Sequence, residues 1–194
     1  MKSYMHYFVA LSMFAFGGCS SDSDLPQSQA ELLKISEEYA EMYKTAGDKG
    51  ATRMQKELTE KKTVEDRSQA LQKYDSFENW KVKVKNVKMS NYYDNNKEVN
   101  FAELEVIFGF KYARFAGVQL SNSNRNFIGV SKNAIVEDTP LFSVLLGLKK
   151  DQQIIVSGQF WKNEKGTIFE KSLSESGGMI APEYVVTFTD IKLN

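Results

Sequence analysis

The chain has almost no histidine or cysteine, and this absence excludes several kinds of chemistry. His6 and Cys19 are the only residues of their types among 194, and both lie near the start. Residues 20–194 therefore offer no Cys/His zinc site and no Ser–His–Asp or Cys–His nucleophile. Motifs of the GxSxG, SxxK, GxGxxG and P-loop types are also missing. We therefore expect no enzymatic activity, no metal and no other cofactor.

The chain also lacks an excess of charge of either sign. Its 25 Lys and Arg residues balance its 25 Asp and Glu residues, and its isoelectric point is about 6.6. Proteins that bind nucleic acid usually show a clustered basic face and a high isoelectric point. We therefore expect nucleic acid not to be the partner of this chain.

What the chain does have is a distinctive first segment. Lys2 precedes an apolar run over residues 7–16, which is shorter than the roughly 20 apolar residues that span a bilayer. Gly17 and Gly18 are small, as a signal peptidase requires. This pattern, followed directly by the only cysteine, Cys19, is typical of bacterial lipoproteins. The alternatives are an ordinary secretory signal with a chance cysteine, or an uncleaved membrane anchor.

Lipidation of Cys19 would fix the location of the protein. We expect residues 1–18 to be removed, the Cys19 thiol to carry a diacylglyceryl group, and the new amino group to take a fatty acid such as palmitate. Several acyl chains anchor a protein stably where one would not. Residues 19–27 are polar and would serve as a flexible tether. The folded part is then expected to face the periplasm, anchored to the outer rather than the inner membrane.

Residues 28–78 are predicted to form a helical appendage. Residues 28–31 match a capping box, and apolar residues then recur at helical spacing as far as Gly47, where the helix is expected to end. A weaker helical segment is predicted for residues 51–62 and another for residues 63–74. These polar helices either pack one stripe on the following domain or form a coiled-coil partner site, and we favour packing.

From Trp80 the pattern changes to alternation, which predicts an antiparallel hairpin. Apolar residues alternate with lysine over 80–85 and with charged residues over 102–112, around a segment rich in turn-forming residues. A register centred on Asp94 satisfies both faces: it pairs Trp80 with Phe108, Val82 with Val106, Val84 with Leu104, Lys83 with Glu105 and Lys85 with Glu103. A slip of one residue would spoil both faces. The lysine row is therefore interpreted as half of a set of cross-strand ion pairs rather than as a nucleic-acid stripe.

Three further strands and one short helix are predicted after this hairpin. The third strand falls within residues 118–132, around Phe127, Ile128 and Val130, and the fourth and fifth cover residues 154–161 and 184–191. Gly158 is expected to mark a bulge or tight bend. Between the third and fourth strands lies a short apolar helix, with Thr139 as its N-cap, Pro140 at its first position and Gly147 at its end.

This order of elements is that of an OB-fold. We predict an α+β, mainly β protein in which residues 79–194 form a five-stranded Greek-key barrel whose short helix closes one end. The run from Leu145 to Phe160 (LLGLKKDQQIIVSGQF) resembles the loop and V-x-V-x-G strand of small bacterial OB-fold proteins, which are grouped as similar to the tRNA-anticodon-binding OB domain. That resemblance implies the fold for roughly residues 80–194 and suggests nucleic acid as the ligand of the family.

The function expected from these features is that of a lipid-anchored envelope binding or scaffold module without catalysis. OB-folds bind along strands two and three, between the first–second and fourth–fifth loops. The candidate contacts are therefore two aromatic and two basic residues on or beside these loops: Tyr92, Tyr93, Arg125 and Lys171. A protein, peptide or glycan of the envelope is the expected partner. The alternatives are an oligonucleotide or oligosaccharide binder that uses the OB-fold face, and a carboxylate-based envelope enzyme.

Overall fold

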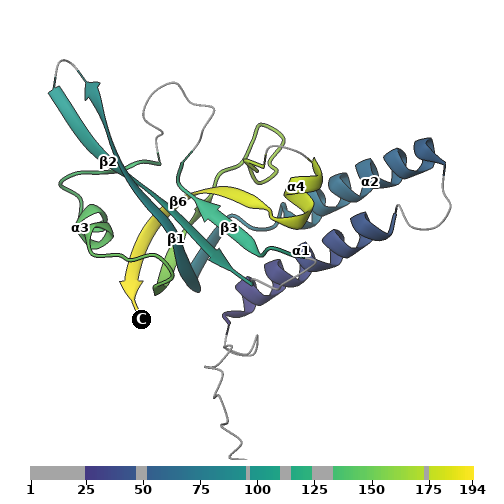
Figure 1. Cartoon of the computed structure of the whole chain (residues 1–194), viewed down its shortest axis with the longest axis horizontal. Helices are drawn as coiled ribbons and strands as arrows, with labels where there is room; N and C mark the ends of the chain where they lie inside the picture. The colour runs from purple at the N-terminus through teal and green to yellow at the C-terminus, as the bar shows by residue number, and fades with distance from the viewer. Residues whose placement is uncertain (1–24, 47–51, 95–96, 110–114, 124–132, 173–174) are drawn as a thin grey trace, which may run out of the picture.

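The computed structural model describes residues 25–46, 52–94, 97–109, 115–123, 133–172 and 175–194. It is an α+β structure, mainly sheet, with four helices in this part of the chain (Figure 1). The elements, in chain order, are α1 (Gln27–Thr45), α2 (Arg53–Leu71), β1 (Ser76–Asp94), β2 (Lys97–Phe108), β3 (Val118–Ser121), β4 (Ile135–Val136), α3 (Pro140–Leu146), β5 (Gln153–Phe160), α4 (Glu175–Ile180) and β6 (Glu183–Leu193). Neither α1 nor α2, the two long helices described, is apolar enough to cross a membrane.

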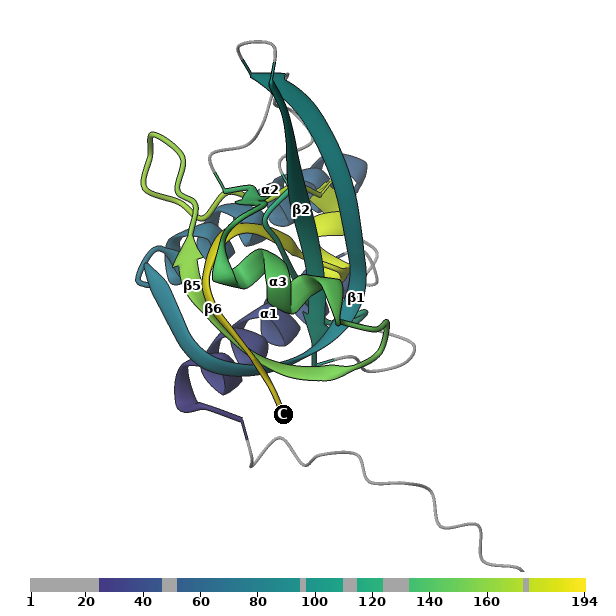
Figure 2. The ribbon, with the colours of Figure 1, turned by 90° about the vertical axis from the view of Figure 1, so that its left-hand side faces the viewer.

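Five strands close into a ring. β1 pairs with β5, β5 with β6, β6 with β3, β3 with β2, and β2 with β1 again, while β4 adds two residues to the edge of β2. All of these pairings are antiparallel except that between β3 and β6, which is parallel. In Figure 2, α3 lies across one open end of the ring and α1 lies behind the other.

The core fills the ring and extends under the helices. Trp80 is fully buried, and its ring packs edge-on against Phe108 with 5.3 Å between the ring centroids. The same apolar cluster includes Leu32 of α1 and Leu145 of α3. Burial of this many aromatic and aliphatic side chains is the main stabilising contribution to the fold. α1 therefore packs an apolar stripe against the sheet, as expected, whereas α2 packs mainly on α1.

Two predictions for the helices are wrong in detail. The capping box expected at residues 28–31 is not formed, because the N-cap is Pro26, two residues before Ser28, and the Ser28 hydroxyl accepts a hydrogen bond from the Trp80 indole N–H at 3.0 Å. The two segments expected after residue 51 form one continuous helix, α2, whose capping box is made by Thr52 and Gln55. Thr63 does not start a new helix, since its hydroxyl donates to the Thr59 carbonyl one turn earlier.

The predicted hairpin between β1 and β2 is confirmed, but its register is wrong. Asp94 pairs with Lys97, so the hairpin is centred between residues 95 and 96 rather than on Asp94. Without a correction, Val84 would then fall opposite Ile107, on the outer face. A bulge at Lys85 takes up one residue and returns Val84 to a position opposite the buried Val106.

The predicted lysine–glutamate pairs are wrong for the same reason. Lys83 lies opposite Ile107, and Glu105 and Glu103 lie opposite Asn86 and Lys88. Lys85 does form a cross-strand ion pair, but with Glu105, at 3.8 Å. The alternation itself is confirmed, since the lysines are exposed and the intervening Trp80, Val82 and Val84 are buried.

The remaining predicted elements are placed close to where the sequence puts them. The Thr139 side chain caps α3 by accepting from the Phe142 amide, and Gly147 ends the helix. The ladders shift register on both sides of Gly158, as predicted, but the extra residues lie in the neighbouring strands: Thr189 in β6, and one of residues 78–79 in β1. The third strand is β3, at the start of the range 118–132; Phe127, Ile128 and Val130 lie outside the described residues.

Candidate binding surfaces

The β1–β2 hairpin extends well beyond the ring. β1 follows β5 as far as Val84, whose amide donates to the Gln152 carbonyl at 2.9 Å and whose carbonyl accepts from the Asp151 amide at 2.8 Å. From Asn86 to Asp94, β1 pairs with β2 alone in the described part of the chain. We call residues 86–94 and 97–103 the hairpin end; it projects from the body of the protein (Figures 1 and 2).

The two tyrosines predicted as ligand contacts lie on opposite faces of this hairpin end. Successive residues of a strand point to opposite faces, and Tyr92 is half-buried with its ring edge-on to Phe101, at a centroid distance of 6.0 Å. Tyr93 is 73% exposed and lies on the same face as Met89, which is 42% exposed. The hairpin end therefore presents two separate apolar surfaces, and Phe101 and Met89 are members that the sequence did not single out.

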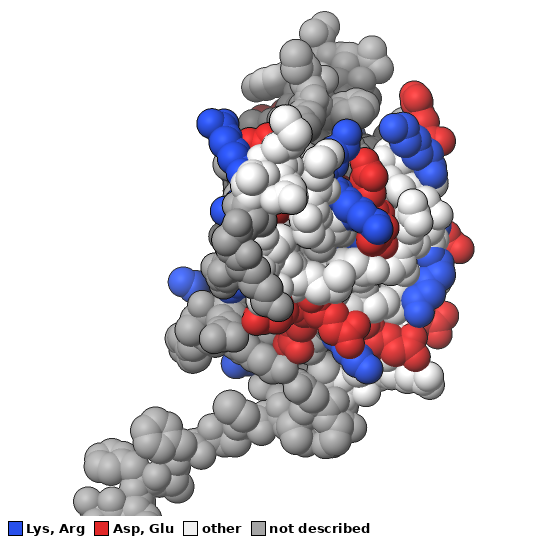
Figure 3. All heavy atoms as spheres, turned by 90° about the vertical axis from the view of Figure 1, so that its right-hand side faces the viewer, with Lys and Arg blue, Asp and Glu red and all other residues white. Residues whose placement is uncertain are grey.

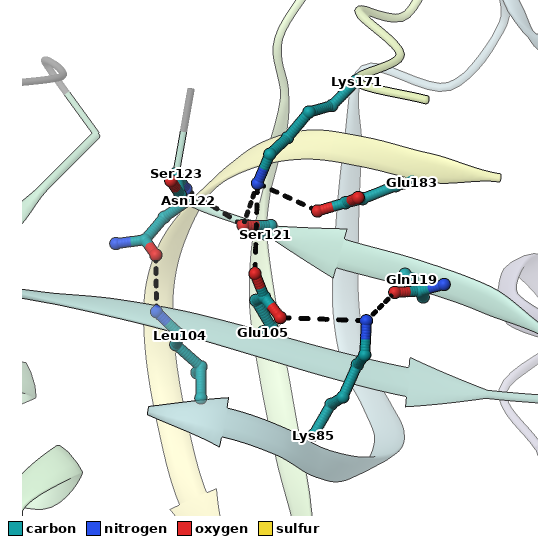
Figure 4. Close-up of polar contacts among 9 residues, drawn as sticks. All are labelled: Lys85, Leu104, Glu105, Gln119, Ser121, Asn122, Ser123, Lys171 and Glu183. Carbon is teal, nitrogen blue, oxygen red and sulfur yellow. Dashed lines mark hydrogen bonds and ion pairs between the residues drawn. The ribbon is translucent and has the colours of Figure 1, made fainter. Parts of the chain in front are cut away.

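Lys171 is placed very differently, in a buried ion-pair cluster (Figure 4). Its side chain is 4% exposed, and its ammonium group lies 2.9 Å from the Glu183 carboxylate, 4.0 Å from that of Glu105 and 3.5 Å from the Ser121 hydroxyl. Lys85 approaches the same Glu105 carboxylate from β1. The cluster contains two cations (Lys171 and Lys85) and two anions (Glu105 and Glu183), so it is electrically neutral. The charge of Lys171 is therefore balanced by carboxylates of the protein itself.

The structure does not bring the predicted contacts together. Lys171 contacts Glu105, whereas Tyr92 lies opposite Val99, six residues nearer the turn on β2. A strand rises about 3.3 Å per residue, so these positions are roughly 20 Å apart along the sheet. Arg125 lies outside the described residues.

The connection between β5 and β6, predicted as a long binding loop, is attached to the body of the protein. Phe169 donates its amide to the Trp161 carbonyl at 2.7 Å, and Lys171 donates its amide to the Glu183 carbonyl at 2.8 Å. Arg67 of α2 holds the same connection from the other side, through the Gly178 carbonyl at 2.6 Å and an ion pair with Glu170. With Lys171, this connection covers part of the outer surface of β2 and β3.

A buried asparagine fixes the end of β3 beside β2. The Asn122 side chain accepts from the Leu104 amide at 2.7 Å and donates to the Ala102 and Asn133 carbonyls, each at 3.1 Å. It thereby satisfies main-chain groups that the short β3 leaves without a strand partner. An isolated asparagine in the sequence carries no signal of this role, because its three partners come from distant segments.

Tyr184 is the strongly shifted titratable group of the described residues. Burial raises the pKa of its hydroxyl to about 12, and the nearby Arg67 guanidinium opposes that shift. Tyr184 lies in β6 and forms an isolated antiparallel bridge with Glu170, the ion-pair partner of Arg67. A shift caused by burial in a packed wall is structural in origin, and it does not mark a catalytic acid or base.

A shallow depression of about 370 Å³ lies beside the bulges of β1 and β6. It is open to solvent and is lined mainly by polar residues, among them Asn79, Ser157, Gln159 and Lys192. Asn79 adopts a left-handed backbone conformation (φ 53°) there, and its amide donates to the Ser157 hydroxyl at 3.0 Å. Within the residues that the structure describes, no three Asp, Glu, His or Cys side chains form a group that could hold a metal ion.

The far end of the two long helices exposes three further apolar side chains. Met42 lies near the end of α1, and Met54 and Leu58 lie in the first turns of α2; all three are at least half exposed. Figure 3 views the molecule from this side and shows uncharged atoms interspersed with acidic and basic side chains. This helical end corresponds to the partner site that the sequence left as an alternative.

Comparison with family models, curated proteins and solved structures finds no match for this chain. The assignment of function therefore rests on the sequence and on the geometry described above.

Proposed function

We propose that this protein is a non-catalytic binding module of the bacterial cell envelope, anchored by lipid on Cys19. The observation that carries the proposal is the hairpin end, which projects from the ring and exposes Tyr93 and Met89 on one face and Tyr92 with Phe101 on the other. Tyrosine supplies a large, rigid contact area at low entropic cost, and aromatic residues dominate many binding interfaces. The lack of histidine and thiol after residue 19 supports a role without catalysis.

We further propose that the ring is an OB-fold. Support comes from the pairing order β1–β2–β3–β6–β5–β1, from the parallel pairing of β3 with β6, and from the short helix α3 between β3 and β5. Under this proposal the hairpin end is the first–second loop of the fold, much extended. The segment containing Lys171 is its fourth–fifth loop.

The position of Lys171 favours a hairpin-mediated mode over the oligonucleotide or oligosaccharide alternative. The face used by OB-folds lies on strands two and three, here β2 and β3. Lys171 covers part of this face, and its charge is balanced by Glu183 and Glu105. Little positive charge is left there to attract a phosphate backbone, which dominates nucleic-acid affinity. A protein or peptide partner at the hairpin end is the interaction that the geometry supports best.

Site-specific photo-crosslinking in the native envelope tests this proposal. A photoreactive phenylalanine analogue replaces Tyr92 or Tyr93 in the full-length chain, and Leu146, an apolar residue of α3 that is 65% exposed, is the matched control position. The proposal predicts an adduct with another envelope protein at one of the two tyrosine positions and none at Leu146. With the analogue at Tyr93, Met89→Ala should weaken that adduct, and with the analogue at Tyr92, Phe101→Ala should do so.

Adducts that form only at Met54 or Leu58 would overturn the proposal in its present form. The helical end would then be the binding surface, and the ring would act as a spacer. Retention of the adducts in the Met89 and Phe101 variants would also contradict it, because contact by proximity alone does not depend on the neighbouring side chain.

A further inference from the structure

The outer edge of β1 in the hairpin end is an unpaired strand edge. Two residues separate the paired Asp94 and Lys97, a connection length that makes these two a hydrogen-bonded pair. Alternate residues counted back from Asp94 then direct their backbone groups toward β2. The residues between them (Val87, Met89, Asn91 and Tyr93) direct theirs away from it.

These outward groups have no strand beside them. β5, which pairs with this side of β1 lower in the ring, begins at Gln153 opposite Lys83, and the chain before it leaves β1 at Val84. Among the described residues, no backbone hydrogen bond reaches the outward groups of Met89, Asn91 or Tyr93. Figure 2 shows the upper part of β1 at the margin of the molecule, with β2 on its inner side.

An edge of this kind is a template for another strand. Natural proteins usually protect such edges with proline, charge, bulges or a covering segment. Residues 86–93 contain no proline and a single charged residue, Lys88, and the bulge at Lys85 lies below them. Among the four residues whose backbone groups point away from β2, Met89 and Tyr93 have exposed apolar side chains, and these lie on one face of the hairpin.

We infer that this edge pairs with the same edge of a second copy of the chain, antiparallel and about a two-fold axis at Asn91. That axis sets Met89 of each copy opposite Tyr93 of the other, so the exposed apolar side chains of this segment cover one another in a sulfur–aromatic contact. In sequence terms it also sets Lys88 opposite an acidic residue, Asp94. Other registers are less favourable. A two-fold axis at Lys88 would place the Lys88 residues of the two copies opposite each other, and an axis at Met89 would place Tyr93 of one copy opposite Lys85 of the other.

The interface is short, and this determines its strength. A single added strand pair lies at the small end of specific interfaces, so the dimer is weak and forms reversibly in solution. A two-fold axis makes the contact isologous and closed, so it produces a dimer and not a fibre. The inference concerns self-association and stands independently of the envelope partner proposed above.

Single-cysteine crosslinking tests both the pairing and its register. The full-length chain with Cys19→Ala, purified in detergent, has no other thiol. Residues opposite one another in a hydrogen-bonded antiparallel pair have Cα atoms about 5.5 Å apart, within disulfide range. Asn91→Cys should therefore form a disulfide-linked dimer under mild oxidation at least ~10 times faster than Lys150→Cys, a control at an exposed site outside this edge.

Ser90→Cys provides the register control. It lies one position from the axis and should crosslink more slowly than Asn91→Cys; the reverse order would overturn the register. Sedimentation of the cysteine-free chain over a range of concentrations should show a reversible dimer, and Met89→Lys should weaken it at least ~10-fold. Met89 is an exposed strand residue, so circular dichroism should show that this variant remains folded.

A chain that stays monomeric at all concentrations, with Asn91→Cys no faster than Lys150→Cys, would overturn the inference. A dimer that persists in Met89→Lys and crosslinks instead through Leu58→Cys would also overturn it, because the contact would then lie on the helical end. In the photo-crosslinking experiment, a second copy and a different envelope protein give adducts of different mass, so the two proposals can fail separately.

Discussion

Arg67 of α2 forms an ion pair with Glu170, which lies 103 residues later in the chain. The Arg67 side chain is 3% exposed, and it also donates to the Gly178 carbonyl at 2.6 Å. One arginine therefore joins α2 to the segment that precedes α4, through Glu170, and to α4 itself, through Gly178. The connection from β5 to β6 is held in place by this contact, although its sequence resembles that of a long loop.

Loss of this arginine should destabilise the whole fold. Arg67→Ala leaves the partly buried Glu170 carboxylate without its partner, and removal of one member of a buried ion pair costs about 3 kcal/mol or more. Urea denaturation should show the loss as a lower midpoint. Arg53→Ala is the matched control, since the Arg53–Glu57 pair is exposed and should contribute less than ~1 kcal/mol. Equal effects of the two variants would contradict a structural role for Arg67.

Gly158 should not tolerate a side chain. A Cβ atom at this position would lie 2.3 Å from the Thr187 carbonyl oxygen and 2.6 Å from the Phe77 ring. We expect Gly158→Ala to lower the free energy of unfolding by about 1–3 kcal/mol, because the β6 backbone at Thr187 or the Phe77 ring must move. Gly147→Ala meets only the Val144 carbonyl oxygen, at 3.7 Å, and should change stability by less than ~0.5 kcal/mol. Thermal unfolding of both variants checks this difference.

Stability should fall in alkaline solution through Tyr184. Burial raises the pKa of its hydroxyl from 10.0 to about 12, so the folded state retains a proton that the unfolded state loses. The contribution is complete below pH 10 and is lost as the pH rises toward 12, by about 2–3 kcal/mol in total. Tyr184→Phe should remove most of this dependence in urea titrations at pH 8 to 12. The same slope in wild type and variant would rule out Tyr184 as its source.

Lys171 should contribute more to the stability of the fold than to ligand binding. Lys171→Met leaves the Glu183 carboxylate without its cation and Glu105 with Lys85 alone, and we expect a loss of about 2 kcal/mol. Adding Glu183→Gln should recover part of that loss, as expected for a coupled pair. Lys150→Met, at an exposed position, is the control. A variant that retains full stability but binds the proposed envelope partner more weakly would instead make Lys171 a ligand contact, as first predicted.

The anchor is tested by its chemistry. Cys19→Ala should abolish incorporation of labelled fatty acid and should alter processing of the first 18 residues, because the thiol is the proposed site of the lipid. Ser20→Ala, at the next residue, should leave labelling unchanged. Continued labelling and membrane association of the Cys19 variant would contradict the proposal that the chain is a lipoprotein.

Local patterns in the sequence determined which residues are inside and which short elements form. Trp80, Val82 and Val84 alternate with lysines, and this period of two predicts the buried face of β1 whatever the partner strand. Thr139 and Gly147 delimit α3 through contacts with residues only a few positions away. Such signals are local, because the atoms that interact are also close in sequence.

Only the tertiary structure decided the register and the sites. The position of the turn and the bulge at Lys85 together set which residues of β1 and β2 meet, and two local errors therefore displaced every predicted pair. Lys171 became buried because Glu105 and Glu183 converge on it from β2 and β6. Arg67 joins α2 to the β5–β6 connection through the Glu170 carboxylate, which lies 103 residues later in the chain. Contacts between distant segments depend on the path of the chain, which no short window of sequence contains.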